Sequence, residues 1–150
     1  MIEALKAKHF RIEEYVPEAV FRDRNEKAWQ LIDIRLIQNM DSLKDQLEDI
    51  YDRKIPITIN NWLWQGERQQ SGLRITGQPY YRPYSQHTFG RAADSICEIE
   101  AKTIRQHIKD QLIVLPHACV IEERDSDGEE IEWLHLDTRN QGKHVYFMRA

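Results

Sequence analysis

Two short segments place the strongest constraint on how this chain can fold. Ser85–Asp94 reads Ser-Gln-His-Thr-Phe-Gly-Arg-Ala-Ala-Asp, and Glu132–Asp137 reads Glu-Trp-Leu-His-Leu-Asp. Together they offer two imidazoles and a carboxylate as metal ligands, with a further carboxylate three residues before the second imidazole. Three protein ligands, an open position for water and a nearby general base are the components of a catalytic zinc site. We therefore expect the fold to bring these two segments together.

The first segment can reach a single ion only through a turn. His87 and Asp94 are seven residues apart, which on a helix would separate them by about 10 Å along the axis. Gly90 allows the backbone to bend back between them, and His135 then arrives from a separate strand. Two nitrogens and one carboxylate oxygen suit zinc, so we expect one zinc ion per chain on His87, Asp94 and His135.

Two carboxylates near His135 leave alternatives open. On a regular strand Glu132 and His135 would point to opposite faces, because side chains alternate. Glu132 can serve the same site only from a bulge or from the loop before the strand. Asp137 shares the parity of His135. It is therefore either a hydrogen-bond acceptor for that ring or a solvated strand end.

The remaining patterns predict an α+β fold. Apolar residues recur at helical spacing over 25–50, which indicates one long helix, or two with a break near 40–42. Glycines and prolines over 65–86 predict a long loop, and loops of this length are usually functional. A further helix is expected over 100–112, with strands over 55–62, 93–97, 118–123, 132–136 and 144–148. This order indicates a small antiparallel sheet with one inserted helix in a single domain, residues 1–150.

Composition excludes some classes of protein. The net charge of -4 and the pI of about 5.9 argue against a nucleic-acid partner bound through its phosphates. No apolar run approaches the ~20 residues that span a bilayer. The N-terminus lacks the apolar stretch of a signal peptide, so we expect synthesis in the cytoplasm. Cys97 and Cys119 form no spacing motif and are expected to be reduced thiols.

Three motifs carry a resemblance to a known family. The first segment resembles the Ser-x-His-x-x-Gly-x-Ala-x-Asp motif of the zinc D-Ala-D-Ala carboxypeptidases and dipeptidases and of the related phage L-alanyl-D-glutamate endopeptidases. Glu132-Trp133-Leu-His135 resembles that family's Glu-x-x-His segment, and Ser71-Gly72-Leu-Arg74 its Ser-Gly-x-Arg. The resemblance spans residues 55–139, with the motifs in the family's order, and implies a hedgehog-like zinc peptidase fold.

The resemblance assigns a role to each matching residue. It implies zinc on His87, Asp94 and His135. It makes Glu132 the catalytic base, because Trp133 occupies the position where some branches carry a histidine. It also implies that Arg74 binds a substrate carboxylate or stabilises the oxyanion, and that Ser85 hydrogen-bonds the substrate or the site's own backbone.

The implied function is that of a zinc metallopeptidase that cleaves peptidoglycan stem peptides. A small single domain fits a phage lysis enzyme or a virion-associated enzyme, which would act on the cell wall after release or from the particle. The alternative is a non-catalytic structural or interaction protein of a virus particle that keeps the fold and the zinc. The expected partners are a stem peptide and, in the virion setting, other virion proteins, with no nucleic acid and no membrane.

Overall fold

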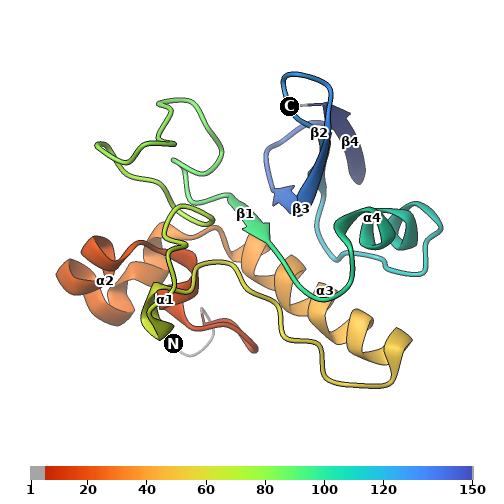
Figure 1. Cartoon of the computed structure of the whole chain (residues 1–150), viewed down its shortest axis with the longest axis horizontal. Helices are drawn as coiled ribbons and strands as arrows, with labels where there is room; N and C mark the ends of the chain where they lie inside the picture. The colour runs from red at the N-terminus through yellow and green to blue at the C-terminus, as the bar shows by residue number, and fades with distance from the viewer. Residues whose placement is uncertain (1–5, 150) are drawn as a thin grey trace.

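The computed structural model describes residues 6–149. Helices make up the N-terminal half and a four-stranded sheet most of the C-terminal half (Figure 1). The helical elements are α1 (Ile12–Tyr15), α2 (Glu18–Arg24), η2 (Asn25–Leu31), α3 (Ile34–Tyr51), η3 (Trp62–Trp64) and α4 (Ala101–Lys109). The strands are β1 (Ala92–Ser95), β2 (Cys119–Arg124), β3 (Glu130–Asp137) and β4 (Val145–Arg149). The α+β class and the inserted helix are therefore confirmed.

The sheet is mixed rather than antiparallel. Its strand order is β1-β3-β2-β4. β3 pairs antiparallel with both β1 and β2, whereas β4 pairs parallel with β2. After β3 the chain crosses over β2 and forms β4 on its far side. There β4 runs antiparallel to β3 and therefore parallel to β2. An antiparallel sheet throughout was the wrong expectation, because strand periodicity does not report which neighbour a strand pairs with.

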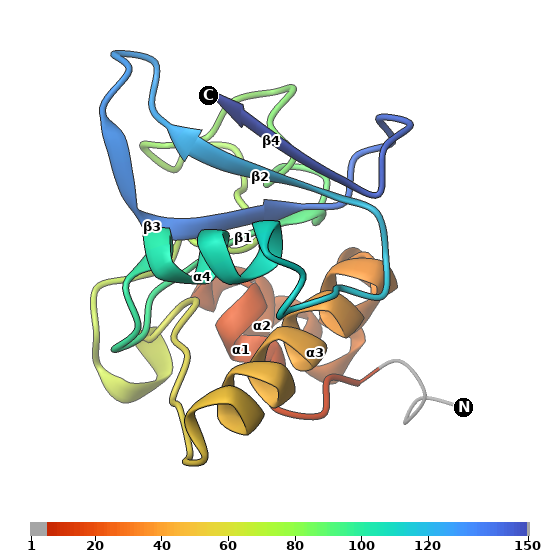
Figure 2. The same ribbon diagram turned by 90° about the vertical axis from the view of Figure 1, so that its right-hand side faces the viewer.

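The apolar core lies between one face of the sheet and the helices. Figure 2 shows α4 directly against the sheet, with α3 beyond it. The fully buried apolar side chains of α3 recur at helical spacing, and the strands contribute one side of their alternation. These core residues are Leu36, Met40, Leu43 and Leu47 from α3, Ile104 and Ile108 from α4, and Ala93, Ile121, Leu134 and Leu136 from the sheet. The opposite sheet face is left for polar side chains and the 65–91 loop.

The predicted helix over 25–50 is broken at Ile32 and Asp33, not near Met40. A 3-10 segment, η2, comes first, and Asp33 then caps α3 by accepting a hydrogen bond from Arg35 N at 2.9 Å. The break lies where Gly90 packs against the chain: a Cβ on Gly90 would lie 1.8 Å from the Leu31 carbonyl oxygen. Asp33 N also donates to Gly90 O at 2.9 Å. The helix boundary therefore helps to fix the turn that carries His87.

The strand predicted over 55–62 is not formed. Only Thr58 pairs, through an isolated antiparallel bridge to Ile96. Asn60 N bonds instead to Glu14 O, and residues 62–64 form η3. This segment is an irregular connection that touches the chain just after β1, at Ile96.

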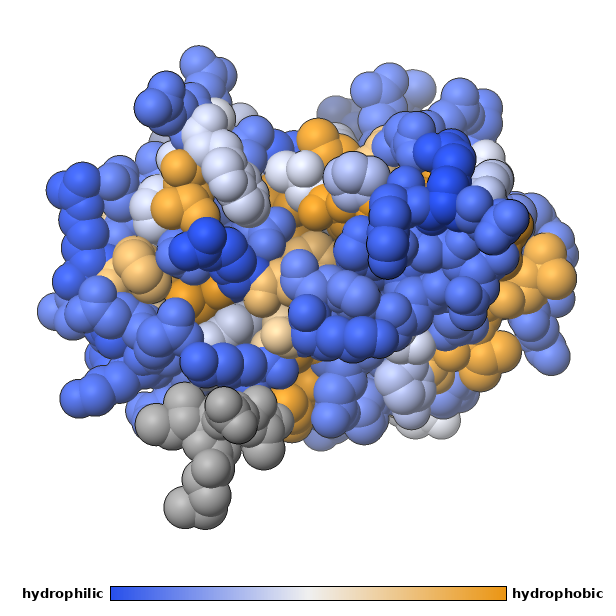
Figure 3. Space-filling model, turned by 90° about the horizontal axis from the view of Figure 1, so that it is seen from below, coloured by the Kyte–Doolittle hydropathy of each residue, from blue (hydrophilic) through white to orange (hydrophobic). Residues whose placement is uncertain are grey.

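The face of the molecule drawn in Figure 3 is largely hydrophilic. Figure 3 shows one face on which hydrophobic residues form separate patches between charged and polar ones. Within residues 6–149, no helix combines the length and the apolar character needed to cross a bilayer.

Candidate metal centre

His87 is held by the turn that precedes β1. Gly90 adopts a φ of +67°, a left-handed conformation that favours glycine. The His87 ring is buried, and its Nδ1 lies 2.8 Å from the Gly72 carbonyl oxygen, to which it can only donate. In the neutral ring the lone pair is therefore on Nε2, whereas in the protonated ring Nε2 can donate to Asp94 Oδ2, which lies 3.2 Å away. Position 72 also packs tightly against the backbone of Tyr15, because a Cβ on Gly72 would lie 2.3 Å from Tyr15 O.

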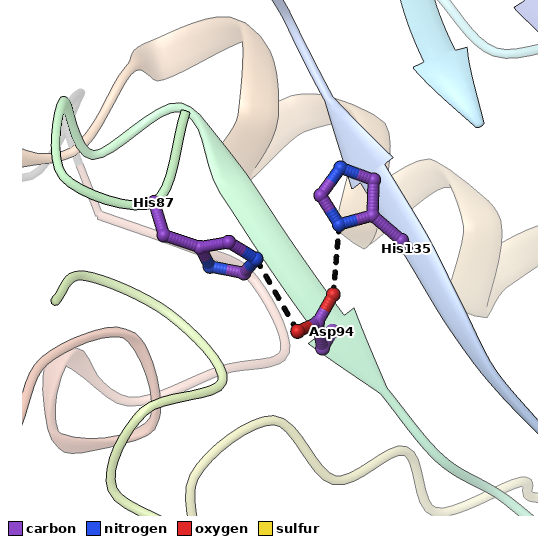
Figure 4. A group of neighbouring side chains, drawn as sticks. All are labelled: His87, Asp94 and His135. Carbon is purple, nitrogen blue, oxygen red and sulfur yellow. Dashed lines mark hydrogen bonds and ion pairs between the residues drawn. The ribbon is translucent and has the colours of Figure 1, made fainter. Parts of the chain in front are cut away.

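Asp94 and His135 come from neighbouring strands. They are direct partners in the antiparallel register of β1 and β3, so their side chains lie on the same sheet face. His135 Nδ1 lies 2.8 Å from Asp94 Oδ1. Figure 4 shows the two imidazoles meeting the carboxylate from opposite sides. One ligand atom from each of His87, Asp94 and His135 lies within 4.8 Å of the others.

Asp137 is a hydrogen-bond partner of His135 and not a solvated strand end. It is fully buried, and its Oδ2 lies 2.8 Å from His135 Nε2. Arg139 contacts both carboxylate oxygens, with Nε donating to Oδ1 at 2.8 Å. Metal-ligating histidines commonly donate their other ring N–H to such a carboxylate, which fixes the ring and the tautomer.

The surroundings favour an ionised Asp94 and a protonated His135. Burial acts to raise the pKa of Asp94, but hydrogen bonds and charge from His135 and His87 outweigh it and hold that pKa well below its usual range. Burial acts to lower the pKa of His135, but its bonds to Asp137 and Asp94 raise that pKa above its ordinary value. An ionised carboxylate is the form that binds a cation, whereas the proton on His135 Nδ1 must leave when metal binds.

The donor set of His87, Asp94 and His135 fits a divalent metal. Each ring has one nitrogen held by a partner, Gly72 O or Asp137, and turns the other toward Asp94. A second group within the described residues, Glu122, His135 and Asp137, also lies close enough for an ion. It is the poorer fit, because both oxygens of Asp137 are already engaged by Arg139.

Arg74 and Ser85 both lie at the cluster. Arg74 Nη2 donates to Asp94 Oδ2 at 3.0 Å, and its Nε donates to Gln70 O at 2.7 Å. Ser85 Oγ accepts from His87 N at 3.3 Å, which supports the turn. Both residues line a pocket of about 320 Å³ together with all three candidate ligands. The 65–86 loop therefore forms one wall of this pocket.

The structure does not bring Glu132 to the cluster. The register of β2 and β3 shifts between the Glu122–His135 and Arg124–Glu130 pairs, so β3 is irregular around Glu132. This side chain is nevertheless exposed and lines a separate pocket with Arg105 and Glu100. Trp133 lines the metal pocket instead. A bulge changes the parity of a strand, but the direction in which it turns each side chain depends on packing.

Glu122 lies at the site although the sequence analysis did not select it. It is opposite His135 in the register of β2 and β3, and its Oε1 is 3.7 Å from His135 Nε2. The only signal available in the sequence was the alternation of 118–123, which places Glu122 opposite in parity to the buried Ile121. The pairing partner could not be inferred from that alternation.

Comparison with protein-family models, with curated proteins and with solved structures finds no match to this chain. The function is therefore argued from the site.

Proposed function

We propose that this protein is a zinc-dependent peptidase that cleaves peptidoglycan stem peptides, with the hedgehog-like fold that its motifs resemble. The observation that carries the proposal is the convergence of His87, Asp94 and His135 in a pocket that also contains Arg74. A bound zinc would polarise the scissile carbonyl and lower the pKa of its water. In this setting the enzyme acts on the cell wall after release from the cell, or as a virion component.

The residues around the cluster have separate tasks in this proposal. The guanidinium of Arg74 is largely buried beside Asp94 and can stabilise negative charge on the carbonyl oxygen, or bind a substrate carboxylate. Ser85 orients His87 through the backbone. Tyr84 and Trp133 are exposed aromatic side chains on the pocket rim and supply apolar contact area for a peptide.

The alternative is a structural or interaction protein of a virus particle. One observation favours it: Asp94 already contacts Arg74, His87 and His135, so the cluster is neutralised without a metal. The two proposals differ in the requirement for metal and in the presence of a product.

A digest of purified peptidoglycan tests the proposal. We expect new stem-peptide fragments by mass spectrometry, abolished by a chelator and restored by added zinc. The variant His87→Ala/His135→Ala should lose both activity and zinc. The matched control His117→Ala/His144→Ala removes two histidines outside the cluster and should keep both. A folded, zinc-loaded protein that releases no fragment would favour the structural alternative.

A further inference from the structure

We propose that Glu122, and not Glu132, accepts the proton from the attacking water in the reaction proposed above. This inference rests on that proposed function. The register carries it: Glu122 on β2 is the direct partner of His135 on β3. Side chains of directly paired residues point to the same face of a sheet. His135 points toward Asp94, so the Glu122 side chain lies on the same face as the candidate ligands.

The pocket has room for this role and few other candidates. Among its described lining residues, only Asp94 and Glu122 carry carboxylates. Asp94 is a candidate ligand and is engaged by two histidines and Arg74. Asp137 is fully buried and engaged by Arg139 and His135. The carboxylates of Asp94 and Asp137 are therefore both engaged by charged partners.

The carboxylate of Glu122, in contrast, has no charged group within hydrogen-bond distance among the described residues. Its nearest charged groups are His135 Nε2 and Arg139 Nη2, both at 3.7 Å, beyond hydrogen-bond distance. Within residues 6–149 its carboxylate makes no side-chain hydrogen bond, and the side chain is 20% exposed. A carboxylate at the edge of the pocket that is reachable by water and not consumed by a partner is suited to general acid–base catalysis.

Glu132 occupies a different setting. It lines the pocket formed with Ile99, Glu100 and Arg105, on the α4 side of β3. His135 is buried on the other side of the strand, beside Asp94. Glu132 lies in the part of β3 between Glu130 and His135 where the register with β2 shifts, and its neighbour Ile131 is buried.

The proposed step balances without a further reactant. The oxygen of water forms a bond to the carbonyl carbon of the scissile amide while one proton passes to a Glu122 carboxylate oxygen. That proton is then delivered to the amide nitrogen as the C–N bond breaks, which gives a carboxylic acid, still carrying the second proton of the water, and an amine. No electron donor or acceptor is required.

The test compares Glu122→Gln with Glu132→Gln, both as full-length, zinc-loaded protein. Glu122 makes no hydrogen bond that glutamine would break, so folding should be preserved. We expect Glu122→Gln to lower the turnover of stem peptide by about 10²–10⁴-fold. Its zinc content and its equilibrium affinity for the stem peptide, measured by calorimetry, should stay at wild-type levels. Glu132→Gln should turn over at the wild-type rate.

Other outcomes would overturn the inference. A collapse of activity in Glu132→Gln with normal turnover in Glu122→Gln would return the role to Glu132. Loss of zinc from Glu122→Gln would make Glu122 a ligand. If wild-type, zinc-loaded protein releases no fragment, the proposed peptidase function fails and the inference fails with it. That result differs from an active wild type with an active Glu122→Gln, which rejects the inference alone.

Discussion

Glu14 in the N-terminal helices and Asp94 on the sheet are both carboxylates that lie largely inside the protein. Around Glu14, burial is the dominant influence and raises its pKa to about 7, although the carboxylate accepts a hydrogen bond from Arg11 N at 2.9 Å. Around Asp94, two histidines reverse the effect of burial and hold the pKa below its usual range. Burial alone therefore does not indicate a site in this protein. The partners of the carboxylate do, because they keep it ionised and able to bind a cation.

The largest effect is expected from Asp94→Asn, which removes the charged ligand but keeps its shape. Zinc content after dialysis should fall from about one ion per chain to near zero, because a neutral amide is a poor ligand beside two imidazoles. Elemental analysis measures this. Asp49→Asn, at an exposed position on α3, is the matched control and should keep its metal. Full zinc content in Asp94→Asn would show that the ion binds elsewhere.

Glu14→Gln tests whether burial raises the pKa of Glu14 and so makes stability depend on pH. The pKa of Glu14 is raised from 4.5 to about 7 on folding. Between these values the folded state holds the proton more tightly, so wild-type stability is greatest below pH 4.5 and falls as pH rises to 7. The variant should be more stable at pH 8, by on the order of 1–3 kcal/mol, and equal to wild type at pH 4.

Denaturant unfolding at both pH values measures the effect of Glu14→Gln. The control Glu67→Gln changes an exposed carboxylate and should leave the pH profile of unfolding unaltered. A Glu14→Gln profile parallel to wild type across this range would mean that Glu14 is solvated, and the contrast with Asp94 would disappear.

Asp137→Asn tests how much the charge of the carboxylate that contacts His135 contributes to metal affinity. The amide oxygen can still accept a hydrogen bond from His135 Nε2, but the charge that increases the basicity of the ring is lost. Such partners typically contribute 10–100-fold to metal affinity, and we expect zinc to bind that much more weakly. Competition with a chelator of known affinity measures it. An unchanged affinity would mean that Asp137 orients the ring by its shape alone.

Asp33→Ala is expected to have the smallest effect. Asp33 caps α3 and accepts a hydrogen bond from Thr138 Oγ1 at 3.1 Å, which ties the helix to the segment after β3. Loss of an N-cap costs about 1 kcal/mol, seen as a lower unfolding midpoint, while zinc stoichiometry should be unchanged. Asp49→Ala, near the end of the same helix, is the control. Loss of zinc from Asp33→Ala would show that this cap also holds the site together.

The sequence by itself determined the α+β class, helix α4 to within a few residues, and the four strands that form the sheet. It did not show that α3 begins only at Ile34, and it added a strand over 55–62 that is not formed. It also selected His87, Asp94, His135, Arg74 and Ser85, which the structure brings together. These predictions succeeded because they rest on local properties. Helical and strand periodicity, a glycine in a turn, and ligand types with a restricted spacing are all visible along the chain.

Only the tertiary structure decided which neighbour each strand takes and which way each side chain turns. The parallel pairing of β4 with β2 depends on a crossover that no local pattern specifies. The break before Asp33 depends on the approach of Gly90, far away in sequence. The separation of Glu132 from the cluster and the arrival of Glu122 follow from the bulge in β3 and the β2–β3 register. Register depends on which residues of two strands pair, so it cannot be predicted from the sequence of one strand alone.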